Sequence, residues 1–291
     1  MFNYYMFYNI IPKERRKFNM YPIKEISALY KKYGFDEGIG NDKFLTFLSQ
    51  EHYFSNAEIV VLDPNSEEIN VQKQEYEEMG YSVRVKNFHD LKFIHNALFD
   101  GFFRVKSSNA KLMREYHEFC EKQSQKVLGN QYEYISGSYF ENGYRKDDNI
   151  IERIQELYGS DGQQLIILEA AAGFGKTCTS FEVIKSLVEK YPQNIPLITE
   201  LSKNRKANLF RYVLLSEIDQ KFPTLNGDLV TYEIGEGRIF VIIDGFDELL
   251  SKSCSSISEP KPNNDVQTML DTISQLFTNG AQTKVLFGHH Y

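Results

Sequence analysis

One stretch of the sequence restricts the possible folds more than any other. Residues 164–169 read Gln-Leu-Ile-Ile-Leu-Glu, which predicts a buried strand, and AAAGFGKT follows at 170–177. Apolar residues then recur at helical spacing through about Lys190. Strand, glycine loop and helix in this order are typical of a loop that binds phosphate, because glycines let successive backbone N–H groups point at one anion. We therefore expect the second half of the chain to be an α/β domain: a P-loop NTPase parallel sheet with flanking helices.

The loop offers backbone donors and two side chains with different tasks. The positive end of the following helix adds to the attraction for an anion. Lys176 is expected to contact the β- and γ-phosphate oxygens, and the Thr177 hydroxyl is expected to bind Mg²⁺. The common pattern places glycine where this chain has Ala170, which fits if its φ is negative. The predicted nucleotide-binding residues are Ala172, Gly173, Phe174, Gly175, Lys176, Thr177 and Cys178.

A second motif follows 68 residues after Lys176, where an apolar run at 239–243 ends in Asp244. Five consecutive apolar residues predict a central strand buried on both faces. A carboxylate at its carboxyl end lies where ligands bind in open α/β sheets, so we expect Asp244 to hold Mg²⁺ directly or through water. Asp247 and Glu248 are placed to polarise an attacking water and, with Lys176, are the predicted catalytic residues.

The first half of the chain predicts a smaller α/β domain, at 1–127, joined by a linker at 128–148 to the phosphate-binding domain at 149–291. A strand at 58–63, a helix at about 66–79 and a strand at 81–86 favour a parallel pair. The spacing of Phe44, Phe47 and Leu48 predicts a helix. The linker is rich in glycine and serine, and its tyrosines favour packing on a neighbour.

A cluster of charged residues in this first half resembles a nuclease site. It consists of Asp63, Glu67, Glu68 and Lys86. The Glu-x-Lys spacing that such a site needs is absent, because the second strand reads Val-Arg-Val-Lys at 83–86. We therefore treat nuclease activity as a minor alternative.

Composition excludes several classes of protein. A net charge of −7 and a pI near 5.5 argue against binding nucleic acid by bulk electrostatics. Three widely spaced cysteines argue against a disulfide framework and favour a reducing, cytoplasmic compartment. The apolar stretch at 1–11 is too short to span a membrane, so no transmembrane segment is expected. Cys178 follows a helix N-terminus, which lowers a thiol pKa, and is either a redox residue or a small buried filler.

The two motifs together resemble the NACHT family of STAND NTPases. The resemblance rests on Ala170-x-Ala172-Gly173-x-Gly175-Lys176-Thr177 and on a strand ending Asp244-Gly-Phe-Asp247-Glu248-Leu249, and it covers about 149–291. It implies ATP or GTP as ligand, Mg²⁺ as cofactor and slow hydrolysis. It also implies a nucleotide-dependent signalling switch in antiphage or innate defence, with an N-terminal effector or adaptor domain at 1–127 and self-oligomerisation of the full-length protein. The predicted element order matches NTPases that place an extra strand between the phosphate strand and the acidic strand.

The chain differs from that family in two respects that affect the activity we expect. The family usually carries Thr-Ser-Arg after its last strand, where this chain has Gly288, His289 and His290. The helical and winged-helix subdomains that close over the nucleotide do not follow. We expect a C-terminally truncated chain in which hydrolysis is slow or lost. Two alternatives stay open: an AAA-type ATPase, and a scaffold that binds nucleotide without hydrolysing it.

Overall fold

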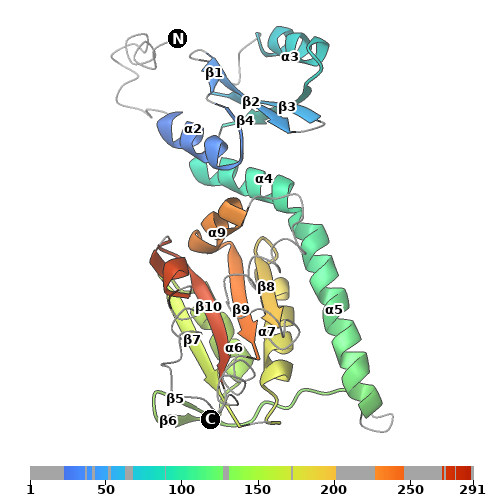
Figure 1. Ribbon diagram of the computed structural model, residues 1–291, viewed down its shortest axis with the longest axis vertical. Helices are drawn as coiled ribbons and strands as arrows, with labels where there is room; N and C mark the ends of the chain where they lie inside the picture. The colour runs from blue at the N-terminus through green and yellow to red at the C-terminus, as the bar shows by residue number, and fades with distance from the viewer. Residues whose placement is uncertain are drawn as a thin grey trace, which may run out of the picture. The chain divides into compact units, whose positions relative to one another are not determined.

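The computed structural model contains two compact units, Met1–Gly101 and Phe102–Tyr291. Both are mixed α/β, as the sequence predicts, and Figure 1 gives the element labels. Within the described parts, no helix is long and apolar enough to cross a membrane. The described residues are 23–36, 38–40, 43–51, 54–62, 68–88, 90–126, 131–171, 173–200, 227–245, 271, 273–278 and 280–289.

The first unit is built on a four-stranded sheet in the order β1-β2-β3-β4. β1 and β2 are antiparallel, as are β2 and β3, whereas β3 and β4 are parallel and joined through α3. The predicted strand–helix–strand unit is therefore confirmed. The elements are α2 (Ile23–Lys32), β1 (Ile39–Gly40), β2 (Phe44–Glu51), β3 (Phe54–Val61), α3 (Ile69–Glu78), β4 (Ser82–Asn87) and α4 (Leu91–Phe103), the last of which runs across the division between the units.

The predicted helix at Phe44–Leu48 is wrong, because these residues belong to β2. Phe44, Leu45 and Phe47 are all buried, since both faces of this central strand are covered. A strand covered on both faces shows no alternation of apolar and polar residues, so its period cannot be read from the sequence. Tyr30 of α2 stacks on Phe47 with ring centroids 3.9 Å apart and fixes this helix to the sheet.

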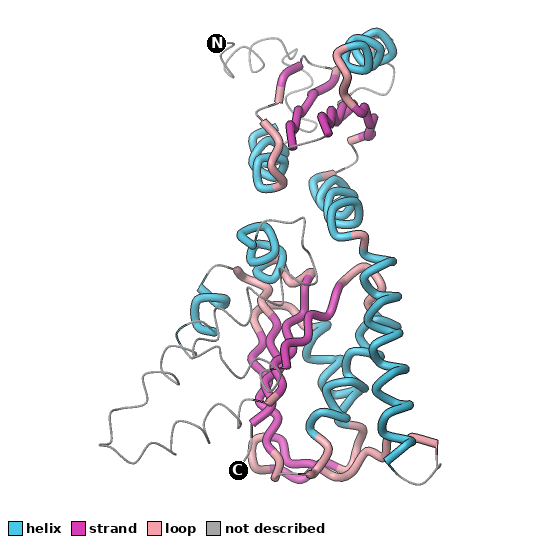
Figure 2. The backbone as a smooth tube through the Cα atoms, turned by 45° about the vertical axis from the view of Figure 1, so that its right-hand side comes forward, coloured by secondary structure: helices cyan, strands magenta, loops and turns pink. Residues whose placement is uncertain are grey.

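The second unit contains a parallel sheet in the order β7-β10-β9-β8. β10, the last of these strands in the sequence, lies between β7 and β9, so an extra strand does separate the phosphate strand from the acidic strand (Figures 1 and 2). The elements are α5 (Val105–Lys126), β5 (Tyr139–Glu141), β6 (Tyr144–Lys146), α6 (Ile150–Gly159), β7 (Gln164–Glu169), α7 (Lys176–Lys190), β8 (Ile195–Glu200), α9 (Gly227–Gly235), β9 (Ile239–Asp244) and β10 (Lys284–His289).

Burial along the strands follows their position in this sheet. Every residue of β9 is buried, as predicted for a central strand. The prediction that β7 is buried is wrong: within the described sheet β7 is an edge strand, and Leu165 and Ile167 are 51% and 55% exposed. α6 covers one face, where Tyr158 donates a hydrogen bond to the carbonyl oxygen of Val241 at 3.2 Å and packs on Phe240.

α5 is part of the second unit, whereas the predicted boundary at 127 placed it in the first domain. The amide of Asn109 donates to the carbonyl oxygens of Pro192 and Asn194 at 3.2 and 3.0 Å. Phe119 stacks on Phe181 of α7, with centroids 4.1 Å apart and ring planes within 7°. α5 is thereby fixed to the helix that follows the glycine loop.

The predicted linker is packed rather than free. The backbone N–H of Tyr132 donates to Ser124 Oγ at 2.8 Å, and the hydroxyls of Tyr134 and Thr179 lie 3.1 Å apart. Its second half forms the β5–β6 hairpin, which Glu141 holds to Arg153 of α6 at 2.9 Å. The described residues of the segment between α5 and α6 therefore contact α5, α6 and α7, the last of which follows the glycine loop.

Candidate functional site

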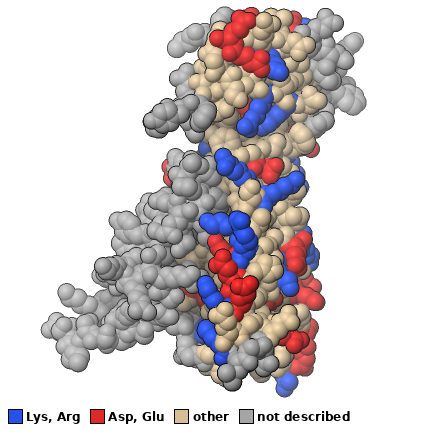
Figure 3. Space-filling view, turned by 90° about the vertical axis from the view of Figure 1, so that its right-hand side faces the viewer, with Lys and Arg blue, Asp and Glu red and all other residues tan. Residues whose placement is uncertain are grey.

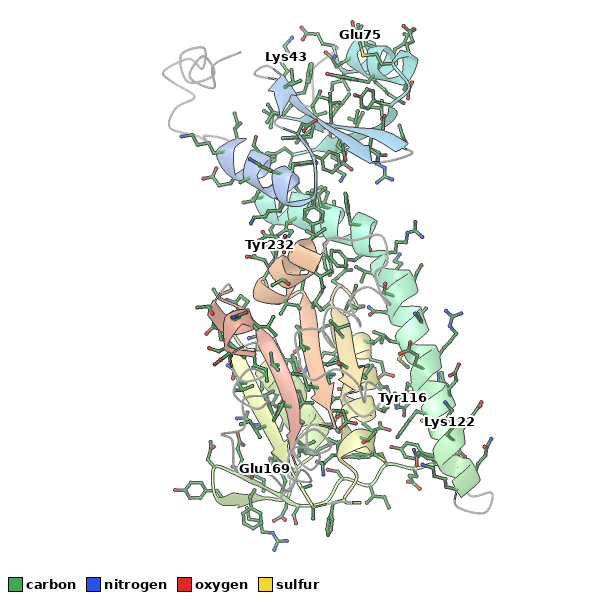
Figure 4. All side chains as sticks on the ribbon, in the orientation of Figure 1. Lys43, Glu75, Tyr116, Lys122, Glu169 and Tyr232 are labelled. Atoms are coloured by element: carbon green, nitrogen blue, oxygen red, sulfur yellow. The ribbon has the colours of Figure 1, made fainter. Side chains whose placement is uncertain are left out.

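The glycine loop joins the end of β7 to the start of α7, and Glu169, labelled in Figure 4, marks the end of that strand. Gly173 and Gly175 have φ values of +79° and +85°, in the left-handed region that residues with a Cβ rarely adopt. Glycine is therefore required at both positions by the backbone. Ala170 is not among the described residues of positive φ, so the alanine that replaces the usual glycine is unstrained, as predicted.

Lys176 lies over the loop that precedes it. Its Nζ donates to the carbonyl oxygen of Ala170 at 2.8 Å and approaches that of Ala171 at 3.4 Å. Gly175 is the N-cap of α7 and has no side chain to accept from the N–H groups of the first turn. Those groups and the ammonium can therefore be offered to an external anion. Thr177 and Phe174 are exposed beside them.

Asp244 ends β9 and is buried. Its position relative to the glycine loop follows from strand register, because Phe287 of β10 pairs with Ile243 and Gly288 pairs with Leu168 of β7. β7, β10 and β9 are consecutive and parallel, so their carboxyl ends form one edge. At about 4.8 Å per strand, β7 and β9 are about 10 Å apart.

Two further observations indicate that Asp244 lies close to the glycine loop. A Cβ built on Gly288 would be 3.4 Å from Asp244 Oδ1, so the carboxylate leans over β10 towards β7. The negative charge of Asp244 also contributes to raising the pKa of Cys178, in the first turn of α7. The glycine loop and the acidic strand therefore meet at the same edge of the sheet.

The donor set fits a hydrated Mg²⁺ only in the presence of a polyphosphate. Thr177 and Asp244 offer a hydroxyl and a carboxylate, which are hard oxygen ligands of the kind Mg²⁺ prefers. The described residues contain no cluster of three or more acidic, histidine or cysteine side chains that could hold a metal alone. Mg²⁺ commonly takes one or two protein ligands and completes its octahedron with water and phosphate oxygens.

Several predicted site residues fall outside the described part of the chain. They are Ala172, Asp247 and Glu248. Their roles remain predictions. The described members of the predicted set, from Gly173 to Cys178 together with Asp244, lie at one edge.

The expected effect of the helix N-terminus on Cys178 is outweighed by its surroundings. Burial raises the pKa of this thiol, and the negative charges of Glu182 and Asp244 raise it further. Hydrogen bonding to Tyr132 and the charge of Lys126 lower the pKa, but by less. Cys178 is therefore better described as a half-buried filler than as a redox residue.

Aromatic residues outside the motifs support α7 from the side. Tyr116 of α5, labelled in Figure 4, donates a hydrogen bond to Glu182 at 2.9 Å. Phe119 and Tyr134 contact Phe181 and Thr179 in the same helix. One sequence pattern indicates this arrangement, namely the tyrosine content of the predicted linker. On the α5 side, basic and acidic side chains are interspersed and neither sign forms a continuous surface (Figure 3).

The first unit holds a buried charge cluster that differs from the nuclease-like set considered above. Glu58 of β3 is buried, and its Oε2 accepts hydrogen bonds from Lys86 Nζ at 2.7 Å and from the Tyr30 hydroxyl at 2.9 Å. Arg84 lies 3.9 Å from the other oxygen. Lys86 of β4 is paired with Val60 of β3, and Val60 is two residues after Glu58. In a Glu-x-Lys strand the lysine would stand at position 60, so Lys86 lies beside the place where that lysine would be.

Of the other members of the nuclease-like set, the structure describes only Glu68, which does not join this cluster. Glu68 pairs with Lys43 at 2.8 Å instead, and Asp63 and Glu67 lie outside the described residues. Among the described residues, Glu58 is thus a single carboxylate faced by two cations. That arrangement repels a divalent metal, because Mg²⁺ sites need several oxygen ligands and net negative charge.

Comparison with known protein families gives one match. Residues 25–142 are similar to the family described as NACHT-associated inactive Restriction Endonuclease 2. The match covers most of the first unit together with α5 and the start of the hairpin, and it ends before the glycine loop. It links the chain to NACHT-containing proteins. No curated protein matches the sequence.

Proposed function

We propose that this chain is the effector-proximal part of a NACHT-type signalling switch, in which the second unit binds a nucleoside triphosphate with Mg²⁺. The observation that carries the proposal is the position of β10, which brings the glycine loop and Asp244 to one sheet edge about 10 Å apart. A triphosphate needs both partners, because one lysine cannot neutralise its charge.

Each described residue then has a definite task. Lys176 exchanges the carbonyl of Ala170 for β- and γ-phosphate oxygens, and the N–H groups of the loop and first turn of α7 surround the phosphates. Thr177 and Asp244 hold Mg²⁺, directly or through water. The bound metal supplies charge neutralisation at the transferred phosphate. Asp247 and Glu248 are proposed to orient water for slow hydrolysis.

The family match supports this proposal from an independent part of the chain. The resemblance to NACHT NTPases rests on residues after 149, whereas the matched family covers 25–142 and is described as NACHT-associated. Two separate segments therefore point to the same protein context. ATP is the proposed ligand, with GTP as the alternative base.

For the first unit we propose a binding or signalling role without strand cleavage. Lys86 and Arg84 neutralise Glu58, so the described residues at the position where a nuclease would hold its metal carry net positive charge. The matched family is described as an inactive restriction endonuclease, which agrees with this chemistry.

The test is nucleotide binding by the chain and its variants, measured with a fluorescent ATP analogue in Mg²⁺ and in EDTA. Lys176→Ala is expected to weaken binding about 10- to 100-fold, since a charge-assisted hydrogen bond contributes about 1.5–3 kcal/mol. Asp244→Asn should keep nucleotide affinity in EDTA but lose most of the gain that Mg²⁺ provides. Lys190→Ala, at the far end of α7, is the matched control.

The outcomes separate the proposal from its alternatives. Unchanged binding in both Lys176→Ala and Asp244→Asn would show that the site is misassigned. Single-turnover hydrolysis of bound ATP distinguishes a slow NTPase from a scaffold that only binds. A motor of the AAA type would turn over many nucleotides per minute, and a switch would not.

A further inference from the structure

Residues 131–136, here called the strap, continue the chain beyond α5 in an extended form. Their side chains alternate in burial: the half-buried ones are Tyr132, Tyr134 and Ser136, and the exposed ones are Gln131, Glu133 and Ile135. An extended chain turns successive side chains to opposite sides, so this alternation shows that one side of the strap lies on the protein. The inward side consists of two tyrosines and a serine.

Tyr134 contacts the turn of α7 that begins at Lys176. Its hydroxyl oxygen is 3.1 Å from that of Thr179, which is buried. The backbone N–H of Thr179 donates to the carbonyl oxygen of Gly175 at 2.8 Å and closes this first turn. Lys176 and Thr177, the proposed phosphate and metal contacts, belong to the same turn. The hydrogen bond between Tyr134 and Thr179 therefore fixes the strap to the turn that is proposed to receive phosphate.

Tyr132 attaches the strap to α5 and α7 together. Its ring packs edge-on against Phe119 of α5, with centroids 5.8 Å apart, and Phe119 in turn stacks on Phe181 of α7. Burial raises the pKa of Tyr132, and the negative charges of Glu182 and Cys178 raise it further, because its hydroxyl faces the same part of α7. The strap, α5 and the first turns of α7 therefore form one packed group.

Side chains, rather than a backbone ladder, hold the strap in place. Residues 131–136 form neither helix nor strand, and the N–H of Tyr132 donates to a side chain, Ser124 Oγ, at 2.8 Å. Ser136 Oγ is a buried atom without a hydrogen-bond partner among the described residues, which opposes docking. A segment held in this way can open locally at low cost in free energy. The strap can therefore be docked or released while the sheet stays folded.

We infer that Tyr134 is a positioning residue for the phosphate-binding turn, so that docking of the strap and binding of nucleotide strengthen each other. The inference rests on the proposed nucleotide function. Phosphate orders the first turn of α7 through its N–H groups, and Tyr134 orders the same turn through Thr179. Each event lowers the ordering cost of the other, and by linkage the factor is the same in both directions.

The position of the strap in the sequence gives this coupling a use. The strap follows α5 directly, and both lie within the matched segment 25–142, whereas α7 lies outside it. Nucleotide binding at α7 would thus be sensed by the end of the matched segment. Docked and released forms of the strap are the two states that such coupling needs.

The test uses Tyr134→Phe, Thr179→Val and the double variant in the whole chain. Each single change removes one hydroxyl and keeps the rest of the side chain close to its original shape. Ile135→Thr is the matched control, because Ile135 belongs to the same strap but is 83% exposed. The affinity for a fluorescent ATP analogue is measured in Mg²⁺ and in EDTA. Amide hydrogen exchange of peptides spanning 131–136 is followed with and without saturating ATP.

We expect each single variant to weaken ATP binding about 2- to 10-fold, the range that loss of one ordinary hydrogen bond produces. The loss should persist in EDTA, because the turn contacts phosphate itself. The double variant should lose no more than the weaker single variant, since both changes remove the same bond. In the parent chain, ATP should slow exchange of the strap amides at least by the factor that the variants lose in affinity. Ile135→Thr should behave like the parent chain.

Thermal unfolding without nucleotide checks the fold, and Tyr134→Phe alone carries the test if Thr179→Val folds poorly. Parent-like ATP affinity in the folded variants overturns the inference and leaves the nucleotide proposal intact. Strap exchange that ATP does not slow also overturns it, even if affinity falls, because Tyr134 would then only support the fold. A parent chain that binds no nucleotide under either condition refutes the proposed function itself, and the inference with it.

Discussion

Replacing Lys86 by methionine tests whether the first unit tolerates a carboxylate without its cation. Lys86 and Glu58 are 17% and 3% exposed, and their charged atoms lie 2.7 Å apart. Removing one partner of a buried ion pair costs about 3–5 kcal/mol, because the other charge stays buried. Methionine keeps most of the volume of the lysine stem, so packing changes little.

Arg84 reduces that cost. It lies 3.9 Å from Glu58 Oε1, and unit charges 4 Å apart at an effective dielectric constant of about 20 attract by about 4 kcal/mol. Arg84 is more than half exposed, so water and salt screen it and roughly 1 kcal/mol is a fairer figure. The net loss expected for Lys86→Met is therefore about 2–4 kcal/mol.

Amide hydrogen exchange is the suitable assay because the chain has two units and need not unfold in one step. Peptides from β3 and β4 should exchange roughly 30- to 700-fold faster in the variant, while peptides from β9 should not change. Adding Glu58→Gln to Lys86→Met removes the unpaired charge and should restore at least half of the lost protection. Lys92→Met, an exposed lysine of the same unit, is the control. A double variant less stable than Lys86→Met would refute the reasoning.

Three further outcomes are expected. Phe119→Ala removes a buried ring stacked on Phe181 and should destabilise the second unit by about 3–5 kcal/mol in urea unfolding; a loss below 1 kcal/mol would contradict the packing described. Arg153→Ala releases Glu141 but removes a half-exposed pair, so global stability should fall by no more than about 1 kcal/mol, while protease cleavage within 139–146 becomes faster. Cys178 has a raised folded pKa, so its thiol is protonated at pH 7.5; alkylation followed by mass spectrometry should be slow there and reach half its maximal rate above about pH 8.5. Any stabilisation from that buried thiol is present below pH 8.5 and is lost as pH rises through the raised value, and fast alkylation at pH 7 would contradict this assignment.

Local patterns predicted those parts of the structure in which one segment determines its own conformation. The strand, glycine loop and helix at 164–190 form as expected, and the apolar run at 239–243 is a buried central strand. Gly173 and Gly175 adopt the conformations that only glycine takes readily. In each case the residue type restricts the backbone directly, so no knowledge of neighbours is needed.

The remaining features depend on partners distant in the sequence. Phe44 and Phe47 lie in a strand covered on both faces, which removes the alternation that would identify it. Lys86 pairs with Glu58 because β3 and β4 are in parallel register, not because of spacing along one strand. The meeting of the glycine loop and Asp244 at one sheet edge depends on the sheet order, since β10 could equally have been an edge strand.

The order of the strands also determines when the site can exist during synthesis. Of the four described strands of this sheet, β10 is made last but lies between β7 and β9, so these two strands cannot acquire their final separation until residues 284–289 have left the ribosome. At about 5–20 residues per second, the 45 residues from Gly245 to His289 require about 2 to 9 seconds. Throughout that interval the nascent chain carries the glycine loop and Asp244 without a sheet edge that unites them. Under the proposed function, capture of the nucleotide would then report that translation has passed β10, and a ribosome stalled before β10 would leave the proposed site incomplete.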